Sequence, residues 1–214
     1  MRVALLGYQG KVGRVLAPAL QAAGHDVEGI GRDDPIKVEG RDAAIHFTRP
    51  DVAYVTVRRC LEQGVPNVVG TTGLGPEELE ALGELAQEKG VQLFVAPNFA
   101  IGAVLMMRFA AEAARHLPRA EIVELHADTK LDAPSGTAKA TAAAMGGDAP
   151  IHSVRLPGLI AHQEVLLSGA GELLTIRHDA LSREAYVPGV LLALERLSGL
   201  PPGLILGLDR LLET

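Results

Sequence analysis

A loop of polar residues offers the clearest chemistry in the chain. His126 and Lys130 can supply a proton and positive charge, and they stand just before the turn-forming sequence DAPSGT. Ser135 or Thr137 can cap a helix that starts there. The backbone N–H groups of Gly136 and Thr137, in the first turn of that helix, would then suit a carboxylate. This combination predicts a small anionic substrate.

A second segment, GYQGKVG, places glycines at positions 7, 10 and 13 between a strand-like and a helix-like run. Glycines allow a tight turn and close approach to a pyrophosphate, and the helix start presents N–H groups and partial positive charge. We therefore expect Gly7, Gly10, Lys11 and Val12 to bind a dinucleotide cofactor. A glycine-rich turn without a ligand is the alternative, and the strand–turn–helix context favours the cofactor.

The residues after the second strand-like run bear on which nicotinamide cofactor is bound. An acidic residue there takes the ribose hydroxyls of NAD, whereas an Arg accepts the 2'-phosphate of NADP. Arg32 is placed to grip a phosphate, and Asp33 can still reach a ribose. The sequence thus favours NADPH with NADH tolerated. A solvated Arg32 in a polar turn is the alternative.

Two further turns follow strand-like runs, GTTG at 70–73 and APNF at 96–99. Open α/β sheets bind ligands at the carboxyl ends of their strands, so both turns are expected to line the same cofactor site. Their hydroxyl and amide groups can hydrogen-bond a nicotinamide carboxamide or a ribose. The residues concerned are Gly70, Thr71, Thr72, Ala96, Pro97, Asn98 and Phe99.

The elements that must position these loops alternate through the first half of the chain. Alternation of strands with helices is typical of a parallel sheet with helices on both faces, a Rossmann-like α/β domain. Strands are expected at 2–6, 27–30, 43–47, 67–69 and 91–96, and helices at 12–23, 50–63 and 76–89.

The second half of the chain has a different pattern. Several strand-like runs follow one another with only one helix between them, which suggests an α+β domain with a mixed or antiparallel sheet. Strands are expected at 121–126, 153–156, 164–167 and 173–177, and helices at 101–117, 137–145 and 183–197.

Composition excludes several classes of protein. The chain has 214 residues and a net charge of -6, with 3% aromatic residues and no Trp, which argues against nucleic-acid binding. A single cysteine, Cys60, rules out an internal disulfide. No apolar run reaches membrane-spanning length, and the N-terminus lacks a signal peptide's features. We expect a cytoplasmic protein with no metal site.

The motifs resemble those of the dihydrodipicolinate reductase family. Its glycine loop and its His-x-x-x-Lys-x-Asp-Ala-Pro-Ser-Gly-Thr-Ala signature correspond here to GYQGKVG and HADTKLDAPSGTA. FTRP at 47–50, PNF at 97–99 and HDALSR at 178–183 also match, so the resemblance covers nearly the whole chain. It implies reduction of 4-hydroxy-tetrahydrodipicolinate or dihydrodipicolinate, a cyclic dicarboxylate imine, to tetrahydrodipicolinate by NADPH or NADH, in diaminopimelate and lysine synthesis.

The resemblance also implies roles for individual residues. His126 would handle a proton or polarise the substrate, and Lys130 would donate a proton and stabilise developing charge. Ser135, Gly136 and Thr137 would bind a substrate carboxylate. It further implies a nucleotide domain of residues 1–99 and 184–214, and a substrate-binding, tetramer-forming domain of residues 100–183.

Three departures from the family pattern stand out. Ala127 occupies the position of a second histidine, so one carboxylate contact is absent or replaced, with Thr129 a candidate. Lys11 replaces the usual Arg and weakens bidentate phosphate contact. The segment 31–42 is short for the family, which predicts the loss of a loop and an edge strand.

Two other hypotheses remain open at this point. A different dehydrogenase, of the aspartate or homoserine type, would share the first half of the chain but lack KLDAPSGTA. A regulator that senses NADP without catalysis would have a disrupted catalytic pair, whereas His126 and Lys130 are both present.

Overall fold

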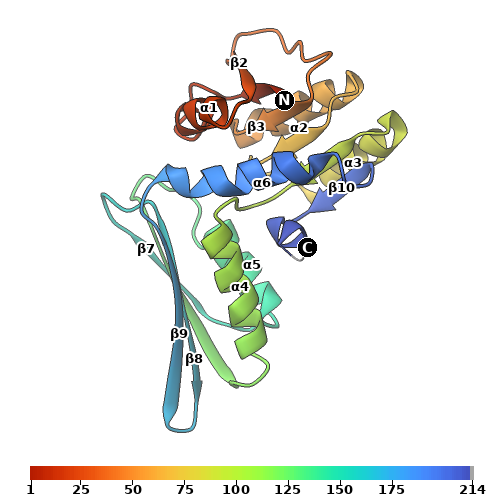
Figure 1. The fold of residues 1–214 in the computed structure, drawn as a ribbon. Helices are drawn as coiled ribbons and strands as arrows, with labels where there is room; N and C mark the ends of the chain where they lie inside the picture. Colours follow the sequence, from red (N-terminus) through yellow and green to blue (C-terminus); the bar gives the residue numbers. More distant parts are fainter. Residues whose placement is uncertain (213–214) are drawn as a thin grey trace. The chain divides into compact units, whose positions relative to one another are not determined.

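The computed structural model describes residues 1–212 and divides the chain into two compact units. The first unit combines Met1–Phe99 with Tyr186–Thr214, and the second is Ala100–Ala185. The second unit is therefore inserted into the sequence of the first. Figure 1 shows the consequence, with α6 and β10, in blue, lying among the elements of the first half of the chain.

The first unit is built on a six-stranded parallel sheet with the order β10-β5-β4-β3-β1-β2. Its inner strands are continuous apolar runs, as expected where helices cover both faces. Helix α1 packs on α6, and α2 packs on α3. The bounds are β1 Arg2–Leu6, α1 Gly13–Ala22, β2 Asp26–Ile30, β3 Ala43–His46, α2 Pro50–Glu62, β4 Asn67–Val69, α3 Pro76–Lys89, β5 Gln92–Val95, α6 Val187–Leu197 and β10 Gly203–Leu206.

The second unit carries a four-stranded mixed sheet with the order β7-β6-β8-β9. Strand β7 is parallel to β6, whereas β8 is antiparallel to both β6 and β9. Ile122, Val165 and Leu167 face α4 and α5 and form a buried apolar cluster with them. The bounds are α4 Ile101–Ala113, β6 Arg119–His126, α5 Gly136–Ala144, β7 Ile151–Arg155, β8 Ala161–Gly169 and β9 Glu172–Ala180.

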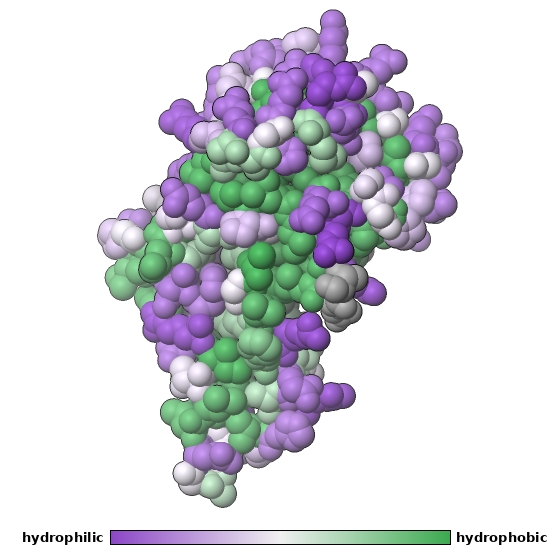
Figure 2. Space-filling view, in the orientation of Figure 1, coloured by the Kyte–Doolittle hydropathy of each residue, from purple (hydrophilic) through white to green (hydrophobic). Residues whose placement is uncertain are grey.

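Hydrophobic residues gather at particular elements of the surface. On the face drawn in Figure 2, the part of the first unit around β2, α2 and α3 is largely hydrophilic, and hydrophobic residues lie over α6 of the first unit and over α4 of the second. Phe109 on α4 is 55% exposed. Within residues 1–212, no helix is both long and apolar enough to cross a bilayer.

The expected fold class is confirmed, with a Rossmann-like parallel sheet followed by a mixed sheet. Some elements differ in extent from the sequence prediction. Helix α4 ends at Ala113 rather than at 117, and a short 3-10 helix, Arg183–Tyr186, precedes α6. Strand β10 was not predicted, because it is stabilised by pairing with β5, which is distant in the sequence.

The short segment 31–42 carries neither helix nor strand. It is held by the side chain of Gln63, at the end of α2, which accepts a hydrogen bond from Val38 N (2.8 Å) and donates one to Ile36 O (3.1 Å). Val38 is fully buried. One amide side chain thus holds two backbone positions of this segment. The loss of an edge strand relative to the family stays a prediction.

Candidate active site

The glycine loop between β1 and α1 has no room for side chains. Gly7 has a φ of 83°, and a Cβ there would lie 2.4 Å from Phe47 O. A Cβ on Gly13 would lie 2.3 Å from Gly7 O. The turn is closed by a hydrogen bond from Gly10 N to Gly7 O (2.9 Å). Glycine is therefore needed for the turn and for the contact of α1 with it.

The exposed part of this loop suits a phosphate. Gly10 and Lys11 are exposed, and Val12 is the residue before the first turn of α1. The first N–H groups of a helix lack partners within it and carry partial positive charge. A dinucleotide pyrophosphate fits a turn in which backbone, rather than side chains, forms the surface.

In the turn after β2, the two acidic residues that follow Arg32 have different roles. Gly31 N donates to the Asp34 carboxylate (2.7 Å), so Asp34 closes the turn. Arg32 and Asp33 are exposed. Asp34 is thereby engaged within the protein, and Arg32 and Asp33 are the charged groups of this turn that can meet a ribose or its phosphate.

The GTTG turn after β4 contains one structural and one exposed hydroxyl. The Thr71 hydroxyl accepts a hydrogen bond from Thr48 N (2.8 Å) and donates to His46 O (3.2 Å). Thr71 thus ties the end of β4 to the end of β3. Thr72 is exposed. At Gly70, a Cβ would lie 2.3 Å from the Phe47 ring.

The APNF turn after β5 is likewise divided between core and surface. Phe99 is 1% exposed, and its ring lies 5.6 Å from Phe47 and 6.1 Å from Phe94, centroid to centroid. Ala96 is also buried, whereas Pro97 is exposed and Asn98 half-buried. Pro97 and Asn98 are the parts of this turn that a ligand can reach from solvent.

In the second unit, a buried carboxylate holds together the end of β6 and the start of α5. Glu124, on β6, is 0% exposed and receives a bidentate ion pair from Arg155 at the end of β7, with N–O distances of 2.7 and 2.9 Å. The same carboxylate accepts a hydrogen bond from Ser135 N (3.2 Å) and another from Nδ1 of His126. Because these donors come from three segments, the carboxylate fixes their mutual positions.

The charge states in this cluster follow from its contacts. Burial raises the pKa of Glu124, but hydrogen bonds from Arg155, Ser153 and His126 outweigh it and lower the value to about 2. For His126, burial lowers the pKa, and Lys130 and Arg155 act in the same direction against Glu124. Near neutral pH the cluster therefore holds an ionised Glu124 and a neutral His126.

Lys130 lies in the turn that leaves β6. Its N–H donates to Ala127 O (3.0 Å), and its ammonium group contacts the Asp132 carboxylate (2.6 Å). The Lys130 side chain is 29% exposed. An ammonium group held at a partly exposed turn can both donate a proton and attract an anion.

The PSGT segment begins α5 in the expected way. Ser135 caps the helix, since its Oγ accepts a hydrogen bond from Ala138 N (3.2 Å), and it is 2% exposed. Gly136 is exposed, with no atom within 4 Å of a Cβ placed there. The open backbone at the start of α5 is thus a place where a carboxylate can approach.

Sequence reasoning assigned no role to Glu124, and it considered Arg155 and His162 only as residues that could help hold a dicarboxylate, with surface or subunit contacts as the alternative. A signal for Glu124 existed, because Glu and His two residues apart on a strand point to the same face. Arg155 gave no such signal, since its contact with Glu124 depends on the pairing of β6 with β7. His162 pairs with Asp179 (2.7 Å), on the neighbouring strand β9.

Two other kinds of site find no support. Across residues 1–212, no group of three or more His, Cys, Asp and Glu side chains could hold a metal ion. Cys60 is buried, which raises the pKa of its thiol to about 12 and leaves it uncharged near neutral pH. A buried neutral thiol is a poor nucleophile.

Comparison with known proteins identifies the family. The dihydrodipicolinate reductase models match residues 21–99 for the N-terminal part and 102–212 for the C-terminal part. The 4-hydroxy-tetrahydrodipicolinate reductase of Mycolicibacterium gilvum is 42% identical over 245 residues, covering 100% of this chain and 99% of the relative. That of Moorella thermoacetica is 46% identical, covering 80% of this chain and 73% of the relative.

Solved structures agree with this result. A dipicolinate-bound dihydrodipicolinate reductase from Paenisporosarcina sp. TG-14 has a TM-score of 0.82 and 33% identity, with 98% of each chain covered. An amine dehydrogenase from Mycobacterium smegmatis, 13% identical with a TM-score of 0.71 over 98% of this chain and 95% of the other, shares the fold alone. The resemblance seen in the sequence is confirmed, and the chain belongs to the dihydrodipicolinate reductase family.

Proposed function

We propose that this protein reduces 4-hydroxy-tetrahydrodipicolinate, or the dihydrodipicolinate formed from it, to tetrahydrodipicolinate with NADPH or NADH, in diaminopimelate and lysine synthesis. The main structural support is the cluster around Glu124, which brings His126, Ser135 and the loop of Lys130 together beside the start of α5. Relatives 42–46% identical that bear the name of this reductase support the proposal.

In this proposal, different residues of the second unit bind the substrate and transfer protons. One carboxylate of the cyclic dicarboxylate binds at the backbone of Gly136 and Thr137, where α5 begins, and Ser135 takes part by capping that helix and bonding Glu124. Lys130 faces the developing negative charge and donates the proton. His126 exchanges a proton through Nε2, since its Nδ1 is engaged by Glu124. The dipicolinate named for the Paenisporosarcina enzyme is itself a cyclic dicarboxylate, which supports this substrate class.

The first unit holds the cofactor, which supplies a hydride when bound. Gly7, Gly10, Lys11 and Val12 bind its pyrophosphate, and Gly70, Thr71, Thr72 and the turn Ala96–Phe99 border its nicotinamide half. Thr71 and Phe99 act there through packing, because their side chains are buried. Arg32 grips the 2'-phosphate of NADPH, and NADH is accepted without that contact.

The same proposal extends to the assembly and its location. We propose a homotetramer in the cytoplasm that binds neither nucleic acid nor membrane, consistent with the net charge of -6. Light scattering coupled to size-exclusion chromatography tests the assembly, and a mass near four times 22.5 kDa is the expected result. A monomer or dimer at micromolar concentration would refute the tetramer.

Turnover of freshly generated substrate tests the function. We expect rapid oxidation of NADPH and NADH by the wild type, and a loss of roughly 10²–10⁴-fold in kcat for Lys130→Ala, the range contributed by a positioned proton donor. Lys139→Ala, on the exposed side of α5, is the control and should leave kcat unchanged. Tight NADPH binding without any turnover would instead favour a nucleotide-sensing regulator.

The cofactor ratio tests Arg32 separately. Replacing Arg32 with Ala should raise the KM for NADPH and leave that for NADH unchanged, since only NADPH carries the 2'-phosphate. Equal changes for both cofactors would contradict the assignment.

A further inference from the structure

We propose that Glu124, held by Arg155, is the positioning residue that decides which ring nitrogen of His126 meets the substrate. Nothing in the sequence signature marks either residue, and both lie outside the HADTKLDAPSGTA segment. The consequence for turnover rests on the function proposed above. The consequence for the histidine itself does not, because it concerns the protein without substrate.

The geometry of β6 brings the two side chains together. Glu124 and His126 are alternate residues of one strand and so share a face of the sheet. Nδ1 of His126 contacts the Glu124 carboxylate directly. An ionised carboxylate can only accept hydrogen bonds, so Nδ1 must carry the proton in the neutral ring. Nε2 then bears the lone pair and is the nitrogen left to exchange a proton with a ligand.

Arg155 makes this arrangement rigid. Each of its two terminal nitrogens donates to one Glu124 oxygen. The nitrogen Nη2 also donates to the backbone oxygen of Asp132 (2.7 Å). The same carboxylate accepts Ser135 N. Glu124 is therefore tied at once to His126 and to the start of α5, where the substrate carboxylate is proposed to bind. The charged groups around His126 are Glu124, Lys130 and Arg155.

Replacing the carboxylate with an amide should invert the tautomer. In Glu124→Gln, the oxygen that accepts from both Ser135 N and one terminal nitrogen of Arg155 should remain an oxygen, because the reverse orientation would set the NH₂ against two donors. The other terminal nitrogen of Arg155, which shares its carboxylate oxygen with His126, then loses its acceptor. The amide NH₂ then faces Nδ1 of His126 and can only donate to it. The proton of the neutral ring must move to Nε2. Nε2, the nitrogen that meets the substrate, then has no lone pair with which to take up a proton.

Nitrogen NMR of histidine-labelled protein tests this without substrate. The wild type should show His126 as the Nδ1–H tautomer at a pH where the ring is neutral, and Glu124→Gln should show Nε2–H. The signals are assigned by their absence in His126→Asn. An Nε2–H tautomer in the wild type overturns the proposal, even if the variant does not fold.

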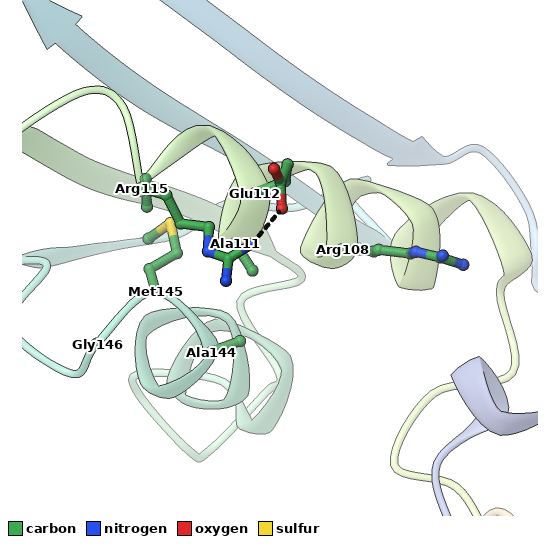
Figure 3. A pocket seen from close by; sticks show the side chains of 8 residues that line it. Arg108, Ala111, Glu112, Arg115, Ala144, Met145 and Gly146 are labelled. Carbon is green, nitrogen blue, oxygen red and sulfur yellow. Dashed lines mark hydrogen bonds and ion pairs between the residues drawn. The ribbon is translucent and has the colours of Figure 1, made fainter.

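Kinetics test the consequence for catalysis. Glu124→Gln should lower kcat about 100-fold while KM changes less than about threefold, because the proton-exchanging nitrogen is altered and the carboxylate site is kept. Glu112→Gln is the matched control. Glu112, on α4, also contacts an arginine and a histidine, Arg115 (3.1 Å) and His116 (3.8 Å). Its side chain is exposed, however, and lies beside an open groove between α4 and the end of α5 (Figure 3).

The outcomes separate this inference from the proposed function. A wild type that turns over, with Glu124→Gln retaining its kcat, sinks the positioning role and leaves the reductase intact. A wild type that shows the Nδ1–H tautomer but no turnover sinks the reductase and leaves the role of Glu124 intact.

Discussion

Opposing influences act on the imidazole of His126. Burial, Lys130 and Arg155 disfavour the protonated ring more than Glu124 favours it, so the pKa of His126 lies below its usual value. A dianionic ligand would reverse this balance, because an opposite charge nearby favours the charged form of a base. Binding and protonation are therefore coupled at this residue.

We predict that dipicolinate binding takes up protons near pH 7. The free ring is neutral, the ligand raises its pKa, and the complex binds up to one more proton per site. Affinity should accordingly fall as the pH rises. Calorimetry in buffers of different ionisation enthalpy measures the uptake, and His126→Asn should abolish it. Release of protons, or uptake unchanged in that variant, would contradict the coupling.

Glu124 should also make stability depend on pH. Its pKa falls from 4.5 to about 2 in the folded protein, so its ionised form stabilises the fold above about pH 4.5 and this contribution is lost as the pH falls towards 2. The shift corresponds to about 3 kcal/mol of unfolding free energy. Urea unfolding should therefore show a gap between wild type and Glu124→Gln that narrows from pH 6 to pH 3. A gap independent of pH would refute this.

At the scale of elements, backbone geometry explains more than side chains in the cofactor loop. Gly7 and Gly13 are each blocked by neighbouring backbone atoms, so the start of α1 and the end of β1 meet without side chains. A phosphate site made of main chain depends on the helix being in place.

We predict that Gly13→Ala disrupts this meeting point. Its Cβ would lie 2.3 Å from Gly7 O, and overpacking of this kind costs roughly 1–3 kcal/mol. Thermal unfolding should show the lowered stability, and NADPH titration should show weaker binding. Gly199→Ala, whose Cβ would lie 3.5 Å from Arg196 O, is the control and should match the wild type in both. Full NADPH affinity in Gly13→Ala would contradict the phosphate site.

The elements that could be predicted from the sequence are those formed by residues close together in the chain. The strand–turn–helix of the cofactor loop and the cap of α5 were predictable because each is written in consecutive residues. Strand β10 was not, since it is stabilised by pairing with the distant β5. The same reason hid the cluster around Glu124, in which Arg155 becomes a neighbour only once β6 and β7 pair.

At the scale of the whole molecule, the second unit interrupts the first. The two ends of the interruption lie together, since a Cβ on Gly189 would be 2.1 Å from Phe99 O. The two segments of the first unit could therefore be joined directly, without residues 100–185.

We predict that the first unit survives excision of the second. A chain in which a short Gly/Ser linker joins residue 99 to residue 186 should fold and bind NADPH, and it should not oxidise it with substrate. Circular dichroism and NADPH fluorescence measure the two properties. Gly13→Ala in the same shortened chain is the control for specific binding. An unfolded product would show that the inserted unit is required for the first sheet.

The position of β10 also has a consequence for how the chain is made. Strand β5 leaves the ribosome long before its partner β10, because the whole second unit is synthesised between them. At roughly 5–20 residues per second, the edge of β5 waits on the order of 5–20 s for its partner. Throughout that interval the nascent sheet exposes unpaired backbone groups on an apolar strand, a template for pairing with other chains. The order of synthesis thus leaves β5 as an open edge until the last strand of the sheet is made.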